Sequence, residues 1–157
     1  ALLNKPDVII ADEPTTALDV TIQAQILKEV KDLAKESGTA LVWITHDLSV
    51  VAGLADNISV MYAGRIVESG PVNSVLDNPL HPYTKGLLES VPKIGDNRHR
   101  LSQIAGMTPS LLNLPSGCPF RPRCWKADDQ CIQNPPVTAK KGNRFARCHW
   151  PLEENVT

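Results

Sequence analysis

Apolar residues near the start of the chain form two short continuous runs, at residues 8–11 and 40–45, which are typical of buried strands. The first run has the character of a parallel strand that is buried on both faces. Between the runs, residues 23–37 carry apolar side chains at helical spacing and charged side chains on the opposite face. A shorter helix is expected at residues 48–55. This order of strand, helix, strand and helix predicts a right-handed crossover and a parallel α/β sheet.

Capping residues support these helix limits. Asp19 or Thr21 can cap the start of the first helix, and Gly38 stands where a left-handed C-terminal residue belongs. Asp47 is expected to cap the second helix. The following part of the chain predicts two short strands in a hairpin or at an edge, and then two short helices, at residues 57–61, 65–69, 72–76 and 84–90.

The character of the chain changes near Val91. Proline and glycine become frequent, periodicity fades, and residues 93–100 form a polar, basic linker. We therefore expect one domain at residues 1–90 and a small irregular appendage at residues 91–157, which has too little apolar sequence for a core of its own. The chain begins without an initiator methionine, on what looks like a helix end before a core strand, so further residues are expected upstream.

Composition and charge exclude several classes of protein. The net charge is −1, 42% of the residues are apolar and 4% are aromatic, which argues against a nucleic-acid-binding or base-stacking surface. No apolar run approaches the ~20 residues of a membrane-spanning helix, and no signal peptide is visible. Any membrane association is therefore expected to come through a partner protein.

Two adjacent carboxylates follow the first predicted strand. Asp12 and Glu13 stand where the strand ends, and Pro14 prevents further ladder pairing. Because ligands bind at the carboxyl ends of strands in open α/β sheets, two acids here indicate magnesium and a nucleotide phosphate. Asp12 would hold the magnesium ion, and Glu13 would accept a proton from the attacking water. The alternative is a pair of acids that only caps the next turn.

His46 follows the second predicted strand, at the same expected edge of the sheet. Its imidazole could hydrogen-bond the γ-phosphate of a nucleotide. Alternatively, it only satisfies backbone groups in a strand-to-helix turn. For Asp19 the simpler interpretation is a helix N-cap.

Three motifs in this region resemble those of ATP-binding-cassette (ABC) ATPases. Residues 8–15, Val-Ile-Ile-Ala-Asp-Glu-Pro-Thr, resemble the Walker B motif and catalytic glutamate of that family. Residues 17–19, Ala-Leu-Asp, resemble its D-loop. Residues 45–47, Thr-His-Asp, resemble its switch histidine, and the three motifs occur in the order of the family.

This resemblance implies an α/β fold that forms the C-terminal half of a P-loop NTPase (RecA-like ABC) core. Asp12 would serve Mg²⁺–ATP, Glu13 would be the general base and His46 would contact the γ-phosphate. Asp19 would lie at the interface between two nucleotide-binding domains. The chain contains no G-x-x-x-x-G-K-[ST] phosphate loop, and the family's glutamine loop and signature motif are missing too. We therefore expect that this chain alone neither binds ATP well nor hydrolyses it.

The four cysteines all lie in the last part of the chain, at Cys118, Cys124, Cys131 and Cys148. The gaps of 5, 6 and 16 residues between them differ from the two-to-four spacing of a zinc knuckle. Four thiolates fit a tetrahedral metal site or a cubane iron–sulfur cluster, and two disulfides are a third interpretation. Seven Lys or Arg and two Asp between Cys118 and Cys148 give a local charge of about +5, which would offset either anionic centre.

A second resemblance covers this tail. Residues 117–124, Gly-Cys-Pro-Phe-Arg-Pro-Arg-Cys, followed by the other two cysteines, resemble the C-terminal extension of ATPases that import oligopeptides, dipeptides and nickel. Residues 81–84, His-Pro-Tyr-Thr, are similar to the motif at which that extension begins; the alternative is a proline-restricted turn whose tyrosine packs on the sheet. The resemblance implies a [4Fe–4S] cluster at the four cysteines, with Zn²⁺ or an empty site as alternatives. Trp125 and Trp150 are expected to bury this site.

Together the two resemblances imply the ATP-hydrolysing subunit of an importer for peptides or a related small solute, at the cytoplasmic face of the cell membrane. Its partners would be a second ABC ATPase subunit (in a homo- or heterodimer), membrane permease subunits and an external solute-binding protein, with no nucleic acid. One alternative is an ABC-superfamily ATPase that serves DNA repair or translation, which is not expected to carry a His-Pro-Tyr turn followed by four cysteines. The other is a metal-dependent regulatory or docking module.

Overall fold

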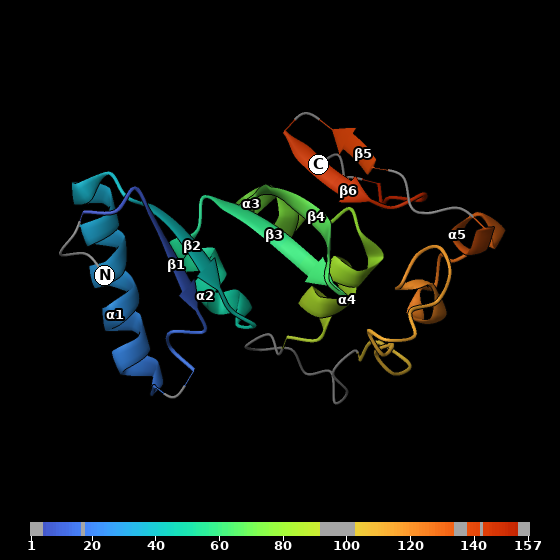
Figure 1. The fold of residues 1–157 in the computed structure, drawn as a ribbon, viewed down its shortest axis with the longest axis horizontal. Helices are drawn as coiled ribbons and strands as arrows, with labels where there is room; N and C mark the ends of the chain where they lie inside the picture. The colour runs from blue at the N-terminus through green and yellow to red at the C-terminus, as the bar shows by residue number, and fades with distance from the viewer. Residues whose placement is uncertain (1–4, 17, 92–102, 134–137, 142, 154–157) are drawn as a thin grey trace. The chain divides into compact units, whose positions relative to one another are not determined.

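The computed structural model describes residues 5–16, 18–91, 103–133, 138–141 and 143–153 (Figure 1). The chain divides into two compact units, Ala1–Ala55 and Asp56–Thr157, which we call unit 1 and unit 2 and describe separately. The expected linker at residues 93–100 lies outside the described residues. No helix in the described part of the chain is long and apolar enough to cross a membrane.

Unit 1 contains two parallel strands and two helices. The elements follow in the order β1 (Val8–Asp12), α1 (Val20–Ser37), β2 (Ala40–Ile44) and α2 (Leu48–Leu54). β1 and β2 pair in parallel, with a register that runs from Val8 opposite Ala40 to Asp12 opposite Ile44. The predicted strand–helix–strand–helix order and the parallel pairing are confirmed.

Local side chains fix the ends of these helices. The Asp19 carboxylate accepts hydrogen bonds from the backbone N–H groups of Thr21 and Ile22, at 3.0 and 2.9 Å, so α1 begins at Val20 and not at the expected residue 23. Gly38 ends α1 in the left-handed conformation, with φ of 69°. Asp47 caps α2 as expected.

Side chains along β1 and β2 alternate between half-buried and exposed. Val8 is 52% exposed and Ile10 is 70% exposed, and Val42 and Ile44 on β2 are both exposed as well. The expectation that the first strand is buried on both faces is therefore wrong for this chain, because the elements of unit 1 cover only one face of the two-stranded sheet.

Unit 2 is built on an antiparallel sheet of the strands β3 (Asn57–Tyr62), β4 (Arg65–Pro71), β6 (Arg144–Arg147) and β5 (Thr138–Lys141), in that spatial order (Figure 1). The predicted hairpin of β3 and β4 is confirmed. Its turn places Ala63 and Gly64 at φ of 47° and 75°, the left-handed pair that matches the twist of a hairpin.

The helices of unit 2 within the described residues are α3 (Val72–Asp77), α4 (Pro82–Glu89), the 3₁₀ helix η2 (Arg121–Arg123) and α5 (Asp129–Gln133). An aromatic cluster lies in its core: the ring centroid of Tyr62 on β3 is 4.6 Å from that of Tyr83 and 5.2 Å from that of Phe120. The expected irregular tail thus contains two strands that the sequence did not predict, and β6 pairs directly with β4.

Candidate functional site

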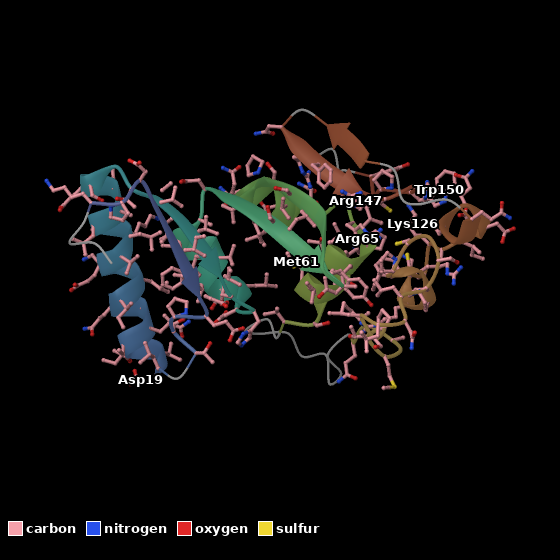
Figure 2. The ribbon with its side chains drawn as sticks, in the orientation of Figure 1. Asp19, Met61, Arg65, Lys126, Arg147 and Trp150 are labelled. Carbon is pink, nitrogen blue, oxygen red and sulfur yellow. The ribbon has the colours of Figure 1, made fainter. Side chains whose placement is uncertain are left out.

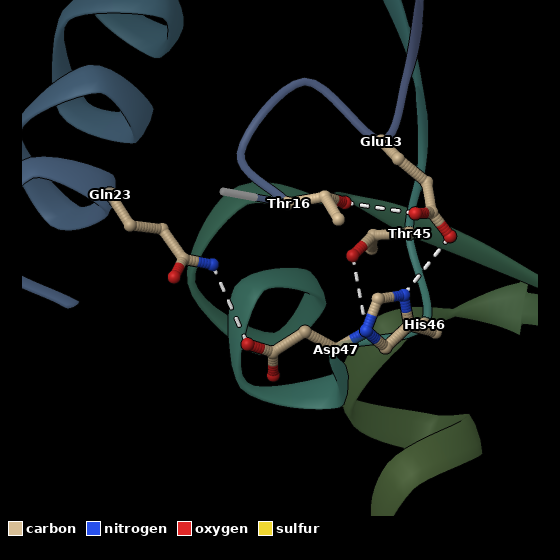
Figure 3. Close-up of polar contacts among 6 residues, drawn as sticks. All are labelled: Glu13, Thr16, Gln23, Thr45, His46 and Asp47. Atoms are coloured by element: carbon tan, nitrogen blue, oxygen red, sulfur yellow. Dashed lines mark hydrogen bonds and ion pairs between the residues drawn. The ribbon is translucent and has the colours of Figure 1, made fainter. Parts of the chain in front are cut away.

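The ends of β1 and β2 bring Glu13 and His46 into direct contact. Glu13 donates its backbone N–H to the carbonyl oxygen of Ile44 at 2.9 Å, which extends the strand pairing by one residue. Its backbone then turns into the left-handed region, with φ of 44°. In this conformation its Oε1 atom lies 3.0 Å from Nδ1 of His46 (Figure 3). The expectation that these two side chains meet at one edge of the sheet agrees with this geometry.

Both carboxylate oxygens of Glu13 have partners. Oε2 accepts a hydrogen bond from the Thr16 hydroxyl at 2.8 Å (Figure 3). The hydrogen bond with His46, followed by that from Thr16, holds the pKa of the Glu13 carboxyl below its ordinary value. The side chains of His46 and Glu13 are 73% and 44% exposed. The pair is therefore ionisable, oriented and open to a ligand from solution.

Asp12 is separate from this pair. It ends β1 with an exposed side chain, and its carboxylate makes no hydrogen bond or ion pair with any other described residue. Asp19 uses its side chain to cap α1, so the N-cap interpretation is confirmed for it. Of the residues expected around the nucleotide, the structure brings Glu13 and His46 together. Asp12, which directly precedes Glu13 in the chain, is exposed.

A second set of contacts, of which the sequence predicted only the Asp47 cap, holds the turn beyond His46. Asp47 accepts hydrogen bonds from the backbone N–H and hydroxyl of Ser49, at 2.9 and 2.6 Å. It also accepts one from the Gln23 side chain at 3.5 Å (Figure 3). The bonds from Ser49 are the main cause that lowers the pKa of Asp47. The Thr45 hydroxyl accepts the backbone N–H of Asp47 at 3.0 Å. The polar residues Thr45 and Asp47 on either side of His46 were the sequence signal for these contacts.

All four cysteines line one pocket in unit 2, although they are far apart in the sequence. Other lining residues come from the start of α4, from the segment around η2 and from the segment after β6, among them His81, Pro82, Phe120, Lys126 and Trp150. Lys126 and Trp150 are labelled in Figure 2. The expectation that Trp150 lies at this site is confirmed. The same expectation for Trp125 is wrong, because its side chain faces solvent, is 56% exposed and does not line the pocket.

The cysteines are free thiols in this structure. Burial raises the pKa of Cys118 and Cys124, and raises that of Cys148 to about 11. Among the described residues, which include all four cysteines, no group of three or more His, Cys, Asp or Glu side chains is arranged to hold a metal ion. The pocket thus gathers four thiols without the arrangement of a single-ion site.

His81, Pro82 and Tyr83 form the turn that leads into α4. His81 is 1% exposed, and its Nδ1 atom accepts the backbone N–H of Tyr83 at 3.0 Å, so it caps the helix while Pro82 occupies the first helical position. Burial lowers the pKa of His81 to about 4. Tyr83 packs on Tyr62 of β3, as the simpler interpretation of this turn expected.

Comparisons with known proteins agree with this arrangement of motifs. A family model described as the C-terminal region of oligopeptide/dipeptide transporters matches residues 67–131. The oligopeptide transport ATP-binding protein OppD of Salmonella typhimurium is 49% identical over 154 residues, which make up 98% of this chain and 46% of that protein. Over nearly its whole length the chain is similar to the C-terminal part of this protein, and residues 67–131 match the transporter family model. A putative peptide import ATP-binding protein of Brucella ovis is 52% identical over 155 residues, which make up 94% of this chain and 46% of that relative.

The similarity to these relatives extends over the residues of both sites described above. OppD of Escherichia coli is 49% identical over 154 residues, and this match too covers 98% of the chain and 46% of the relative. The chain therefore spans about half the length of the curated relatives it matches. The match to the family model contains the His81 turn and three of the cysteines, and Cys148 follows it.

Proposed function

We propose that this chain is part of an ATP-hydrolysing subunit that drives the import of oligopeptides or a related small solute. The contact between Glu13 and His46 at the ends of two parallel strands carries the proposal. It brings a carboxylate that would act as general base to the same edge as an imidazole that would bind phosphate. The names of the relatives, which refer to peptide transport or import and to ATP binding, support the same function.

In this proposal Asp12, Glu13 and His46 have separate roles. Asp12 presents an exposed carboxylate without a hydrogen-bond partner among the described residues, which suits the oxygen ligands that Mg²⁺ prefers. Glu13 accepts a proton from the attacking water through its ionised carboxylate. His46 donates a hydrogen bond to the γ-phosphate. Bound Mg²⁺ would supply charge neutralisation at the phosphates.

In this proposal, the groups that bind the phosphates of ATP are supplied by residues that are not in this chain. The chain contains no phosphate loop of the form G-x-x-x-x-G-K-[ST], so we propose that it supplies the C-terminal half of a P-loop NTPase core and is inactive alone. Residues 1–90 would complete that core, and residues 91–157 would form the extension that carries the cysteines. Asp19, beside its role as an N-cap, would face a second nucleotide-binding domain.

The proposed assembly contains several partners. A second ATPase subunit, identical or homologous, would complete the nucleotide sites, and permease subunits would hold the pair at the cytoplasmic face of the membrane. An external solute-binding protein would deliver the solute. The presence of the cysteine tail favours this importer over an ABC ATPase of DNA repair or translation.

We further propose that the four-cysteine pocket holds a [4Fe–4S] cluster. Zinc binds each of four sulfurs at about 2.3 Å, so a zinc site needs four sulfurs packed around one point. A cubane cluster binds each cysteine through a different iron atom, so its sulfurs lie further apart. The four free thiols that line one pocket supply the four ligands that such a cluster needs, and Zn²⁺ is the alternative occupant of the same ligand set. When bound, such a cluster would add redox-active iron to the tail.

A graft onto a relative tests the transport function. The part of Salmonella OppD that aligns with this chain is replaced by the chain, and the hybrid is expressed in cells that lack their own OppD. We expect restored uptake of an oligopeptide, and loss of uptake when Glu13 is changed to Gln. A hybrid that is expressed and assembles with the permease but supports no uptake would argue against an importer.

Metal analysis tests the cluster separately. Protein prepared without oxygen should contain about four irons and four sulfides per chain and absorb broadly in the visible range. A colourless protein with one zinc per chain would rule out the iron–sulfur proposal. Cys118→Ser in the same preparation should lower the iron content, whereas Cys118→Ser without any effect would remove this residue from the site.

A further inference from the structure

A fully buried carboxylate lies outside both sites described above. Glu68 on β4 is 0% exposed, and both of its oxygens accept hydrogen bonds. Oε1 accepts the backbone N–H of Leu80 at 2.8 Å and an Nη2 hydrogen of Arg144 at 3.0 Å, and Oε2 accepts the backbone N–H of His81 at 2.8 Å. One side chain therefore joins a central strand, the turn before α4 and strand β6.

Arg144 reaches Glu68 across a glycine. The side-chain carbon Cγ of Arg144 would lie 3.0 Å from a Cβ atom at Gly70, so the missing side chain at Gly70 makes room for the arginine. Arg144 is 6% exposed and also donates a hydrogen bond to the carbonyl oxygen of Asn78. Because an unpaired buried charge is costly, Arg144 and Glu68 hold each other in place.

The groups that Glu68 fixes are walls of the cysteine pocket. His81 lines this pocket, and its backbone N–H is bound by Glu68. Cys148, His149 and Trp150 line the same pocket and follow β6 directly. Among the described residues, β6 pairs with β4 at Glu68 with Ala146 and at Ser69 with Phe145, and the Arg147 side chain donates a hydrogen bond to the carbonyl oxygen of Ile66 at 3.3 Å.

The other three cysteines have local support instead. Cys118 donates its backbone N–H to the carbonyl oxygen of Cys131 at 3.1 Å, and Cys124 donates its own to Arg121 at 3.1 Å. The backbone N–H of Cys131 is bound by Asp128. These contacts are all made within the segment that contains the three cysteines. The same segment also contacts the residues that follow Cys148, because Lys126 donates a hydrogen bond to the carbonyl oxygen of Pro151 at 3.4 Å and Asp128 is hydrogen-bonded to the Trp150 side chain.

We propose that Glu68 and Arg144 are positioning residues for the four-cysteine pocket, which together set the place of Cys148 relative to the other three cysteines. Neither residue lines the pocket. They act through the backbone of the His81 turn and through β6. The inference concerns the pocket to which we assigned a cluster, but the positions of the thiols can be tested without any metal.

The environment of Glu68 makes Glu68→Gln a sharp test. Three donors converge on its carboxylate, so an amide of the same shape would turn its own N–H₂ group toward at least one of them. The variant keeps the volume and removes one acceptor. Glu89→Gln is the matched control, because Glu89 is exposed and forms only an i,i+4 ion pair with Lys85 at 3.3 Å. Arg144→Lys keeps the positive charge and loses the forked donor.

The experiment measures the rate at which iodoacetamide alkylates each cysteine in the folded, metal-free chain, read by mass spectrometry at one pH. We expect Glu68→Gln to speed alkylation of Cys148 at least tenfold and that of Cys118 less than threefold, with Glu89→Gln unchanged. Arg144→Lys should show the same selectivity with a smaller increase for Cys148.

Urea unfolding of each variant separates positioning from general loss of stability. If all four cysteines accelerate by one common factor, in step with the unfolded fraction, Glu68 and Arg144 only stabilise the fold and the proposal is wrong. If Glu68→Gln does not fold, Arg144→Lys decides by the same criterion. A native protein that contains only zinc, or no metal, would contradict the cluster proposal. It would leave the expected alkylation rates of the metal-free chain unchanged.

Discussion

Nδ1 of His46 lies 3.0 Å from Oε1 of Glu13, although 33 residues separate them in the chain. The contact exists because β1 and β2 run in parallel and end at the same edge, so that Glu13, the first residue after β1, lies close to His46, the second residue after β2. It follows that the pKa of the Glu13 carboxyl depends on His46, and this dependence can be measured in the chain itself.

The first prediction concerns the titration of Glu13. Because His46 is the main cause of the lowered pKa and Thr16 is the next, His46→Ala should raise the pKa of Glu13 toward 4.5, and Thr16→Val should raise it by less. Carbon-detected NMR of the Glu13 carboxyl between pH 2 and 7 would report both changes. Glu36 on α1 serves as an internal reference. Equal effects of the two substitutions, or none, would contradict the geometry.

The second prediction concerns the pH dependence of stability. The pKa of His81 is about 4 in the folded chain, against an ordinary value of 6.5 for histidine, so below pH 6.5 the unfolded chain binds a proton that the folded chain does not. The free energy of unfolding should therefore fall by about 3 kcal/mol as the pH is lowered from 6.5 to 4. Below pH 4, protonation of His81 should cause no further change in stability.

His81→Asn is the matched variant for this effect. Asparagine keeps an acceptor for the backbone N–H of Tyr83 and is a good N-cap, but it does not titrate. Urea unfolding of the metal-free chain at several pH values should show the wild type losing stability relative to His81→Asn as the pH falls. Stability curves that stay parallel between pH 7 and 4 would show that His81 is not buried in its neutral form.

The third prediction compares two glycines with the same backbone conformation. Gly117 and Gly64 both have φ of 75°, but a Cβ atom at Gly117 would lie 2.1 Å from the carbonyl oxygen of Cys131, whereas nothing lies within 4 Å at Gly64. Gly64→Ala should cost about 1–2 kcal/mol for the left-handed backbone alone. Gly117→Ala should cost roughly 1–3 kcal/mol more, because the backbone at Cys131 has to move.

Urea unfolding of the two variants measures this difference. Alkylation of Cys118 and Cys131 should also be faster in Gly117→Ala than in Gly64→Ala, since the close approach of their backbones would be lost. Equal stabilities of the two variants would mean that the segment around Cys118 does not pack against α5.

The elements of unit 1 could be predicted because their signals are local. Apolar runs mark β1 and β2, and Asp19, Gly38 and Asp47 act within a few residues of the helix ends they define. The burial of β1 could not be read in the same way. A continuous apolar run is compatible with two covered faces, but how many are covered depends on which elements pack against the strand.

The strands of the tail were missed for a related reason. β6 is four residues long, and its place in the sheet depends on pairing with β4, where Glu68 lies opposite Ala146. No local pattern reports a partner so distant in sequence. The buried pair of Glu68 and Arg144 had no signal either, because isolated charged residues in short strands usually face solvent.

At the candidate site, the sequence predicted which residues would meet but not how they are held. Glu13 and His46 were expected at one edge from their positions after two strands. The contacts of Thr16 with Glu13 and of Gln23 with Asp47 depend on the paths of the turns. Those paths include a left-handed backbone at Glu13, which the sequence does not reveal because glutamate rarely adopts it.

The most direct measurement of the proposed function is Mg²⁺-dependent ATP hydrolysis by the purified hybrid of this chain with the remainder of Salmonella OppD. We expect the unmodified hybrid to hydrolyse ATP and the chain alone to be inactive. Glu13→Gln should lower the hydrolysis rate of the hybrid by about 10²–10⁴-fold, the usual contribution of a general base, while ATP binding is retained. A Glu13→Gln hybrid that hydrolyses ATP as fast as the unmodified hybrid would contradict the role of Glu13.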